Sequence, residues 1–205
     1  MMYMTMAGLT LAFSLLAGAP QDAGALRAVR TPALAEALER KIEDFERRQK
    51  ERRVKDETVA VSEGELNSYL NLSPKLKLPD GLSDVRFLFE REQISATGQL
   101  DLDVLRGKGK VGSGNPIDPL TLLSGNIPVE VSGRLKNEAE GFGAFEIQGV
   151  RLGPVMLPVS VLAQIVASAT RSQENPQGFD IQAPFRLPYA LKRVRIQPGR
   201  ALLDF

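Results

Sequence analysis

Two acidic residues close together are the first place where this sequence could carry chemistry. Asp101 and Asp103 are separated by one residue, so on a strand their carboxylates would share a face and could hold a hard cation such as calcium. Polar residues that alternate with Leu100, Leu102 and Val104 are also typical of the solvent face of a strand. Since calcium takes several oxygen ligands, two carboxylates alone do not make a site, and we favour the solvent face.

A glycine-rich stretch, GKGKVG from Gly107 to Gly112, is the second candidate. It matches the GxGxxG pattern of dinucleotide-binding proteins, in which the glycines lie between a strand and a helix. No helical pattern follows this stretch, so the match lacks its context. We expect a loop with Lys108 and Lys110 in solvent.

Two residue types that most enzymes use are missing. The 205 residues include no histidine and no cysteine. This removes the commonest general base, the thiol nucleophile and the soft ligands of zinc. No Ser-x-x-Lys sequence offers a serine–lysine pair either. We therefore expect a non-enzymatic protein without catalytic residues, metal or cofactor.

The charge balance limits the partners. The chain has 26 basic and 25 acidic residues, so no overall field attracts it to nucleic acid, although local contact with a membrane surface remains open. With 205 residues and 43% hydrophobic content, one domain with its own core is expected.

The first 25 residues have the pattern of an export signal. Ala7 to Ala19 is an apolar run of signal-peptide length, and Ala23-Gly24-Ala25 is a small-x-small cleavage signature. We expect cleavage near Ala25 and a periplasmic or extracellular protein. Since MMYMTM at the start has no Lys or Arg, an uncleaved anchor and a buried first helix remain alternatives. The lack of cysteine argues against a lipoprotein anchor.

Residues 26–57 are predicted to contain a charged amphipathic helix. Thr31 is the expected N-cap, Pro32 the first helical residue, and the helix would reach Val54. Its narrow apolar seam could dock a partner protein of the envelope and consists of Leu34, Leu38, Ile42 and Phe45. The basic residues beyond the seam are interpreted as a solvated helix end, with lipid headgroups or a partner as the alternative.

Residues 58–205 are predicted to form one α+β domain. Val59 to Val61 reads as a short strand, and Ser62 with Glu65 forms a capping box at the start of a helix over Glu63 to Asn71. From Ser83 the apolar period changes to two, which predicts antiparallel strands with a hairpin turn at residues 90–93.

The rest of the domain continues this alternation around one further helix. That helix begins after Pro158, and it is apolar around nearly its whole circumference as far as Thr170. The strands expected from the alternation cover residues 83–89, 94–104, 127–135, 142–152, 191–197 and 201–205. This order predicts a curved antiparallel β-meander with helices packed on its concave face.

Two motifs carry a family resemblance. VSEGELNSYLN from Val61 and VRLGPVMLPVSVLAQIV from Val150 resemble small exported bacterial envelope proteins with a tubular lipid-binding, or TULIP-like, fold. The resemblance covers residues 59–205. It implies a sheet wrapped around an apolar groove in which acyl chains lie. The chain departs from it by lacking a lipobox cysteine and by its extra helix from Thr31 to Val54.

Candidate groove residues are chosen by type from the helices and the first hairpin. They are Leu66, Tyr69, Leu70, Phe87, Phe89, Leu162, Ile165 and Val166. Ordinary core packing explains each of them equally well. The leading hypothesis is an exported protein that binds lipid or another hydrophobic small molecule. The alternative is an envelope interaction module that uses the charged helix, and a carboxylate enzyme built on Asp101 and Asp103 is third.

Overall fold

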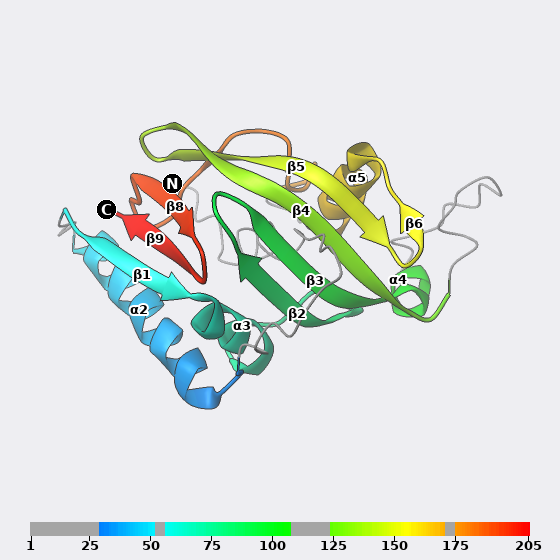
Figure 1. Ribbon diagram of the computed structural model, residues 1–205, viewed down its shortest axis with the longest axis horizontal. Coiled ribbons are helices and arrows are strands. Elements are labelled where there is room, and N and C mark those ends of the chain that lie inside the picture. The colour runs from blue at the N-terminus through cyan, green and yellow to red at the C-terminus, as the bar shows by residue number, and fades with distance from the viewer. Residues whose placement is uncertain (1–28, 52–55, 108–123, 171–174) are drawn as a thin grey trace.

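The protein is an α+β structure with two antiparallel sheets (Figure 1). The computed structural model describes residues 29–51, 56–107, 124–170 and 175–205. The predicted export signal in residues 1–25 lies outside these ranges, as do Lys108 and Lys110 of the glycine-rich stretch. Within these ranges, no helix is both long and apolar enough to cross a membrane.

The larger sheet is a meander of consecutive antiparallel neighbours in the order β2-β3-β4-β5-β6, with β7 also pairing with β5. Its strands are β2 (Leu82–Phe89), β3 (Ile94–Asp101), β4 (Asn126–Ala139), β5 (Phe142–Leu152), β6 (Val155–Met156) and β7 (Phe185–Arg186). The Glu90 amide donates to Gln93 O over 2.9 Å and closes the first hairpin. The predicted α+β class, the antiparallel meander and this hairpin are confirmed.

The smaller sheet joins the strand that follows helix α2 (Pro32–Lys50) to the C-terminal end of the chain. β1 (Thr58–Ser62) pairs with β9 (Arg200–Asp204), which pairs with β8 (Arg193–Gln197). Thr58 lies opposite Asp204 and its hydroxyl donates to that carboxylate over 2.7 Å. The sequence predicted these strands but not their pairing.

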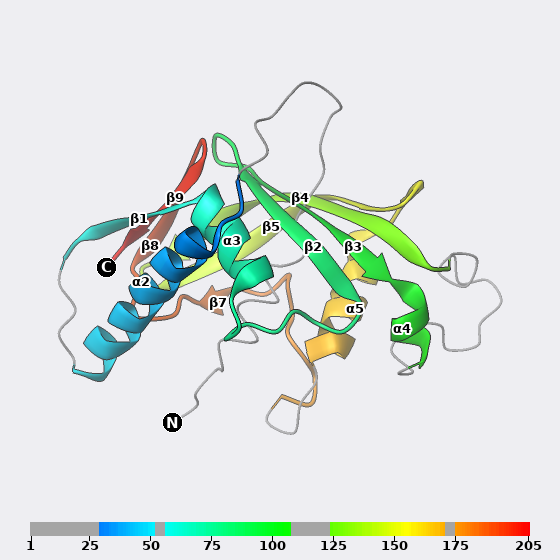
Figure 2. The same ribbon diagram turned by 90° about the horizontal axis from the view of Figure 1, so that it is seen from below.

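The six-stranded sheet buries one face. On β2, Val85, Phe87 and Phe89 are 1 to 2% exposed, while the residues between them are exposed. Helix α3 (Glu63–Leu72) lies along β2, and helix α5 (Val159–Thr170) lies beside β5 at a distance from α3 (Figure 2). The irregular chain of residues 175–192 completes this cover through Ile181, which is 3% exposed.

Helix α2 (Pro32–Lys50) packs on the rest of the protein through its apolar seam. As predicted, Thr31 is the N-cap and accepts from the Leu34 amide. Leu38 is buried against Val61 and Tyr69. The ring of Phe45 lies 4.8 Å from that of Phe205. The described helix ends at Lys50, and residues 52–54 of the predicted helix lie outside the described ranges.

The prediction of a strand through Val104 was wrong. β3 ends at Asp101, and helix α4 (Leu102–Gly107) follows at once. The Asp101 carboxylate accepts from the amides of Asp103 and Val104 at 3.0 and 3.1 Å, as an N-cap does. Local hydrogen bonding by this side chain therefore overrides the alternating pattern.

Two phenylalanines test whether α2 is part of the fold. Phe45→Ala should lower the free energy of unfolding by about 3–5 kcal/mol, because Phe45 is 4% exposed in the core. Phe142→Ala is the matched control, since Phe142 is 44% exposed and should lose less than about 1 kcal/mol. Urea unfolding of both variants measures the difference. Equal, small losses would mean that α2 does not stabilise the fold.

Candidate functional site

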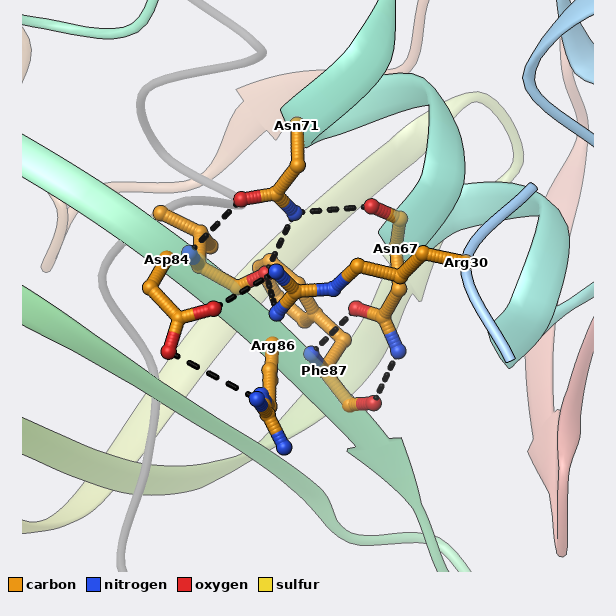
Figure 3. A network of polar contacts seen from close by, with 7 residues as sticks. Arg30, Asn67, Asn71, Asp84, Arg86 and Phe87 are labelled. Carbon is orange, nitrogen blue, oxygen red and sulfur yellow. Dashed lines mark hydrogen bonds and ion pairs between the residues drawn. The ribbon is translucent and has the colours of Figure 1, made fainter. Parts of the chain in front are cut away.

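The most organised polar feature is the contact between α3 and the free edge of β2, shown in part in Figure 3. The Asn67 amide group donates to Phe87 O over 2.9 Å and accepts from the Phe87 amide over 2.6 Å. Asn71 makes the same pair of bonds with Val85, at 2.7 and 3.0 Å. Glu63 accepts from the Phe89 amide. We call Glu63, Asn67 and Asn71 the edge ladder.

The spacing of the edge ladder matches the strand. Four helical residues rise about 6 Å, and two residues of a strand about 6.8 Å, so side chains four apart meet backbone groups two apart. α3 therefore takes the place of a neighbouring strand. The Gly199 amide completes the edge by donating to Phe89 O over 2.9 Å. A strand edge with these partners is closed to pairing with another chain.

The start of α2 reaches the same edge. Arg30 donates to the Asp84 carboxylate over 2.6 Å and to Val85 O over 3.1 Å (Figure 3). Asp84 has a φ of 50°, and the register of β2 shifts between Ser83 and Arg86, so the strand bulges here. Val85 O thus accepts from both Arg30 and Asn71, and both helices are fixed at one point of β2.

The chain uses the same device once more among its described residues. Asn137 of β4 donates to Val194 O and accepts from the Val194 amide, both over 2.9 Å. This pair attaches the edge of β8 to the larger sheet. It offers a matched comparison for the asparagines of α3.

The pKa values of two glutamates at the start of α3 are shifted in opposite directions. Burial raises the pKa of Glu63 above its ordinary 4.5, although the Phe89 amide favours the charged form. Burial acts in the same direction on Glu65, but hydrogen bonds from Lys41 and the Ser62 backbone outweigh it and lower the pKa of Glu65. Lys41 Nζ lies 2.6 Å from Glu65 Oε1. The predicted capping box of Ser62 and Glu65 is confirmed.

Most candidate groove residues meet in one apolar cluster. The candidates that belong to this main cluster are Leu70 of α3, Phe87 and Phe89 of β2, and Leu162 and Val166 of α5. Leu66 is half-buried and touches both this cluster and a second one. Tyr69 lies in the second cluster, which faces α2. The side chain of Ile165 lies outside the described part of the chain.

These side chains are packed against protein. The five in the main cluster are 0 to 3% exposed. Such low exposure means that protein atoms surround these side chains almost completely. A hydrophobic ligand at this place would have to displace part of the cover of the sheet.

The seam of α2 faces inward. Leu38 and Phe45 are 5% and 4% exposed, and Leu34 and Ile42 are half-buried. These four residues are therefore occupied within the chain while α2 is docked. A partner of the docked helix would meet its charged outer face instead.

The acidic residues form no catalytic cleft in the described part of the chain. Asp103 accepts from the Gly125 amide over 3.0 Å and is exposed, and Asp101 caps α4. Among the described residues, no three potential metal ligands gather. A shallow hollow of about 440 Å³ lies along α2, but its cations Arg40, Lys41 and Arg48 are already in ion pairs.

The fold and the ladder define an α+β protein with two antiparallel sheets, whose larger sheet is closed at one edge by helix side chains. Comparison of the chain with protein-family models, with curated proteins and with solved structures finds no match.

The edge ladder was not predicted from the sequence. Its signal is the recurrence of Glu63, Asn67 and Asn71 every four residues, which puts three hydrogen-bonding side chains on one helix face. That face could as well have met solvent. Only the position of β2 gives it a partner.

The two glutamates predict opposite pH dependences. The pKa of Glu65 is lower in the folded protein than its ordinary 4.5. Its carboxylate therefore stabilises the folded state above pH 4.5, and this stabilisation is lost as the pH falls through the lower pKa of the folded state. Glu65→Gln should therefore be less stable than the wild type at pH 7, and the gap should close in acid.

For Glu63, the raised pKa means that stability falls as pH rises from 4.5 to the higher folded value. Glu63→Gln should therefore equal or exceed the wild type at pH 7. Urea unfolding of both variants between pH 3 and about pH 7 checks this. Gaps of the same sign for both would contradict the assignment.

Proposed function

We propose that this chain is an exported, non-enzymatic protein that binds lipid or another hydrophobic ligand against the apolar face of its larger sheet. The observation that carries the proposal is the main cluster. Leu70, Phe87 and Leu162 come from α3, β2 and α5, and belong to one apolar body. Pockets for hydrophobic ligands are lined mostly by such side chains. The lack of histidine and cysteine agrees with a binding role.

The finer form of the proposal is a TULIP-like arrangement. In it, the meander is curved, and α3 and α5 are walls on its concave face. Acyl chains would lie along the sheet between these walls. The support is the one-sided burial of β2 and β4, whose inward residues are apolar and whose outward residues are largely exposed.

The segment of residues 175–192 is one part of the cover that can yield to a ligand. Residues 175–192 contain only the short strand β7. Their apolar side chains nevertheless reach the core: Phe185 stacks on Phe145 with ring centres 4.8 Å apart. A segment with few backbone hydrogen bonds opens at lower cost than a strand of the sheet. Ligand could therefore replace these side chains without disrupting the meander.

Mass spectrometry of the full chain, produced in a bacterial periplasm, tests the proposal. The native spectrum should contain an adduct of lipid mass that denaturation removes, because the ligand is held by apolar contacts and not covalently. A clean apo mass, together with no saturable binding of a dansyl-labelled fatty acid, would contradict it. That result would favour the envelope interaction module, with the outer face of α2 as the next surface to change.

Paired leucine variants locate the site. Leu162→Ala should weaken binding of the dansyl-labelled fatty acid by roughly tenfold, because buried apolar contact is lost. Leu88→Ala is the control, since Leu88 is 39% exposed on the opposite face of the sheet and should bind like the wild type. Fluorescence titration at a temperature where both variants are folded measures the ratio. Equal affinities would place the ligand elsewhere.

A further inference from the structure

Part of the apolar contact between α2 and α3 is separate from the main cluster. Leu38, Val61 and Tyr69 form a second cluster of their own, joining α2, β1 and α3. The Thr31 amide also donates to Ser68 Oγ over 3.1 Å. Of the α3 residues, only Leu70 is a fully buried member of the main cluster. Phe45 of α2 is also a buried member of the main cluster, but it lies at the other end of the unit formed by the two helices, beside Phe205. At the end near Val85, the two helices therefore reach the main cluster through one fully buried side chain, Leu70.

The contact of this unit with the edge of β2 is made by polar bonds. Arg30, Asn67 and Asn71 bind backbone groups and one carboxylate of β2. When such groups separate, water can replace each partner, so opening leaves no unpaired polar group. Separating apolar side chains over an equal area would instead expose them to water and cost the whole free energy of their burial.

The unit is held firmly at its other end. The Glu63 amide donates to Gly199 O over 3.0 Å at the start of α3. Near the end of α2, Phe45 packs on Phe205, and Arg48 pairs with Glu57. By contrast, residues 73–81 after α3 are irregular, with a long bond of 3.4 Å from the Leu76 amide to Ser73 O. The free end is therefore the one that meets Val85.

We propose that α2 and α3 form a lid over the β2 end of the apolar face and that Arg30, Asn67 and Asn71 are its latch. Release of the latch swings both helices about their ends near β1 and uncovers Leu70, Phe87 and the neighbouring core. The ligand's passage through this opening rests on the proposed function. The opening itself does not.

Hydrogen–deuterium exchange of the full chain tests the opening. In Asn67→Ala/Asn71→Ala, the amides of Val85 and Phe87 lose their acceptors, so they exchange faster whether or not the lid opens. The informative peptide is therefore residues 32–40 of α2, which makes no hydrogen bond to either asparagine. Its exchange should quicken at least about tenfold, because the first turns of α2 lose their anchor at Val85 in the open state and fray. Peptides of β4 should change much less. Asn137→Ala is the matched control: it removes the same pair of bonds at Val194 and should leave residues 32–40 unchanged.

Two results would overturn the lid. In one, only residues 85–89 exchange faster, so that α2 does not move with the latch. In the other, residues 32–40 and β4 quicken together in the double variant, as global destabilisation requires. Should the double variant not fold, Arg30→Gln removes the ion pair with Asp84 and the guanidinium bond to Val85 O, and it is read in the same way.

Release of a dansyl-labelled fatty acid separates the two proposals. With a working lid and a binding site, the latch variant should release the probe faster than the wild type, while Asn137→Ala should not. Faster exchange in residues 32–40 with no probe binding in any variant would keep the lid and reject the ligand. Probe binding with equal release rates in all variants would keep the site and reject this route.

Discussion

The pairing of the β2 edge by side chains of α3 is the constraint on which the rest of the structure depends. The backbone amides and carbonyls of an outer strand need partners, and here Asn67, Asn71 and Glu63 supply them in the spacing of a strand. Because the ladder fixes α3 in direction and register, Leu70 falls on the main cluster and Tyr69 on the second. Tyr69, held in this position, then contacts Leu38 in the apolar seam of α2.

This solution has an electrostatic consequence at the start of α3. A carboxylate that accepts from a strand amide must be partly buried, and burial of Glu63 disfavours its charged form. Two residues on, Glu65 is also shielded from water, but Lys41 and the capping box compensate it. At the start of α3, ionisation of Glu63 therefore destabilises the folded protein, whereas ionisation of Glu65 stabilises it.

The proposed ligand site and the proposed lid both involve the apolar face of the larger sheet. The apolar face of the sheet is covered by two helices and an irregular segment, and the latched end of α2 and α3 is held by exchangeable polar bonds. A protein that admits a hydrophobic ligand needs a cover that opens without unfolding the sheet. In the proposed lid, one end is held by Phe45 against Phe205 and by the Glu63 bond to Gly199 O, and the other end is held by polar bonds to β2.

The sequence by itself determined the local structure. Thr31, Ser62 and Glu65 cap their helices through neighbours three residues away, and period-two alternation places Val85, Phe87 and Phe89 on one face. It also excluded the chemistry of histidine and cysteine. Tertiary structure alone decided the pairing of Thr58 with Asp204, which are 146 positions apart, and the inward use of the α2 seam. It likewise made the asparagines of α3 partners of β2. The residue type determines which hydrogen bonds a side chain can make, but the fold determines which groups lie within its reach.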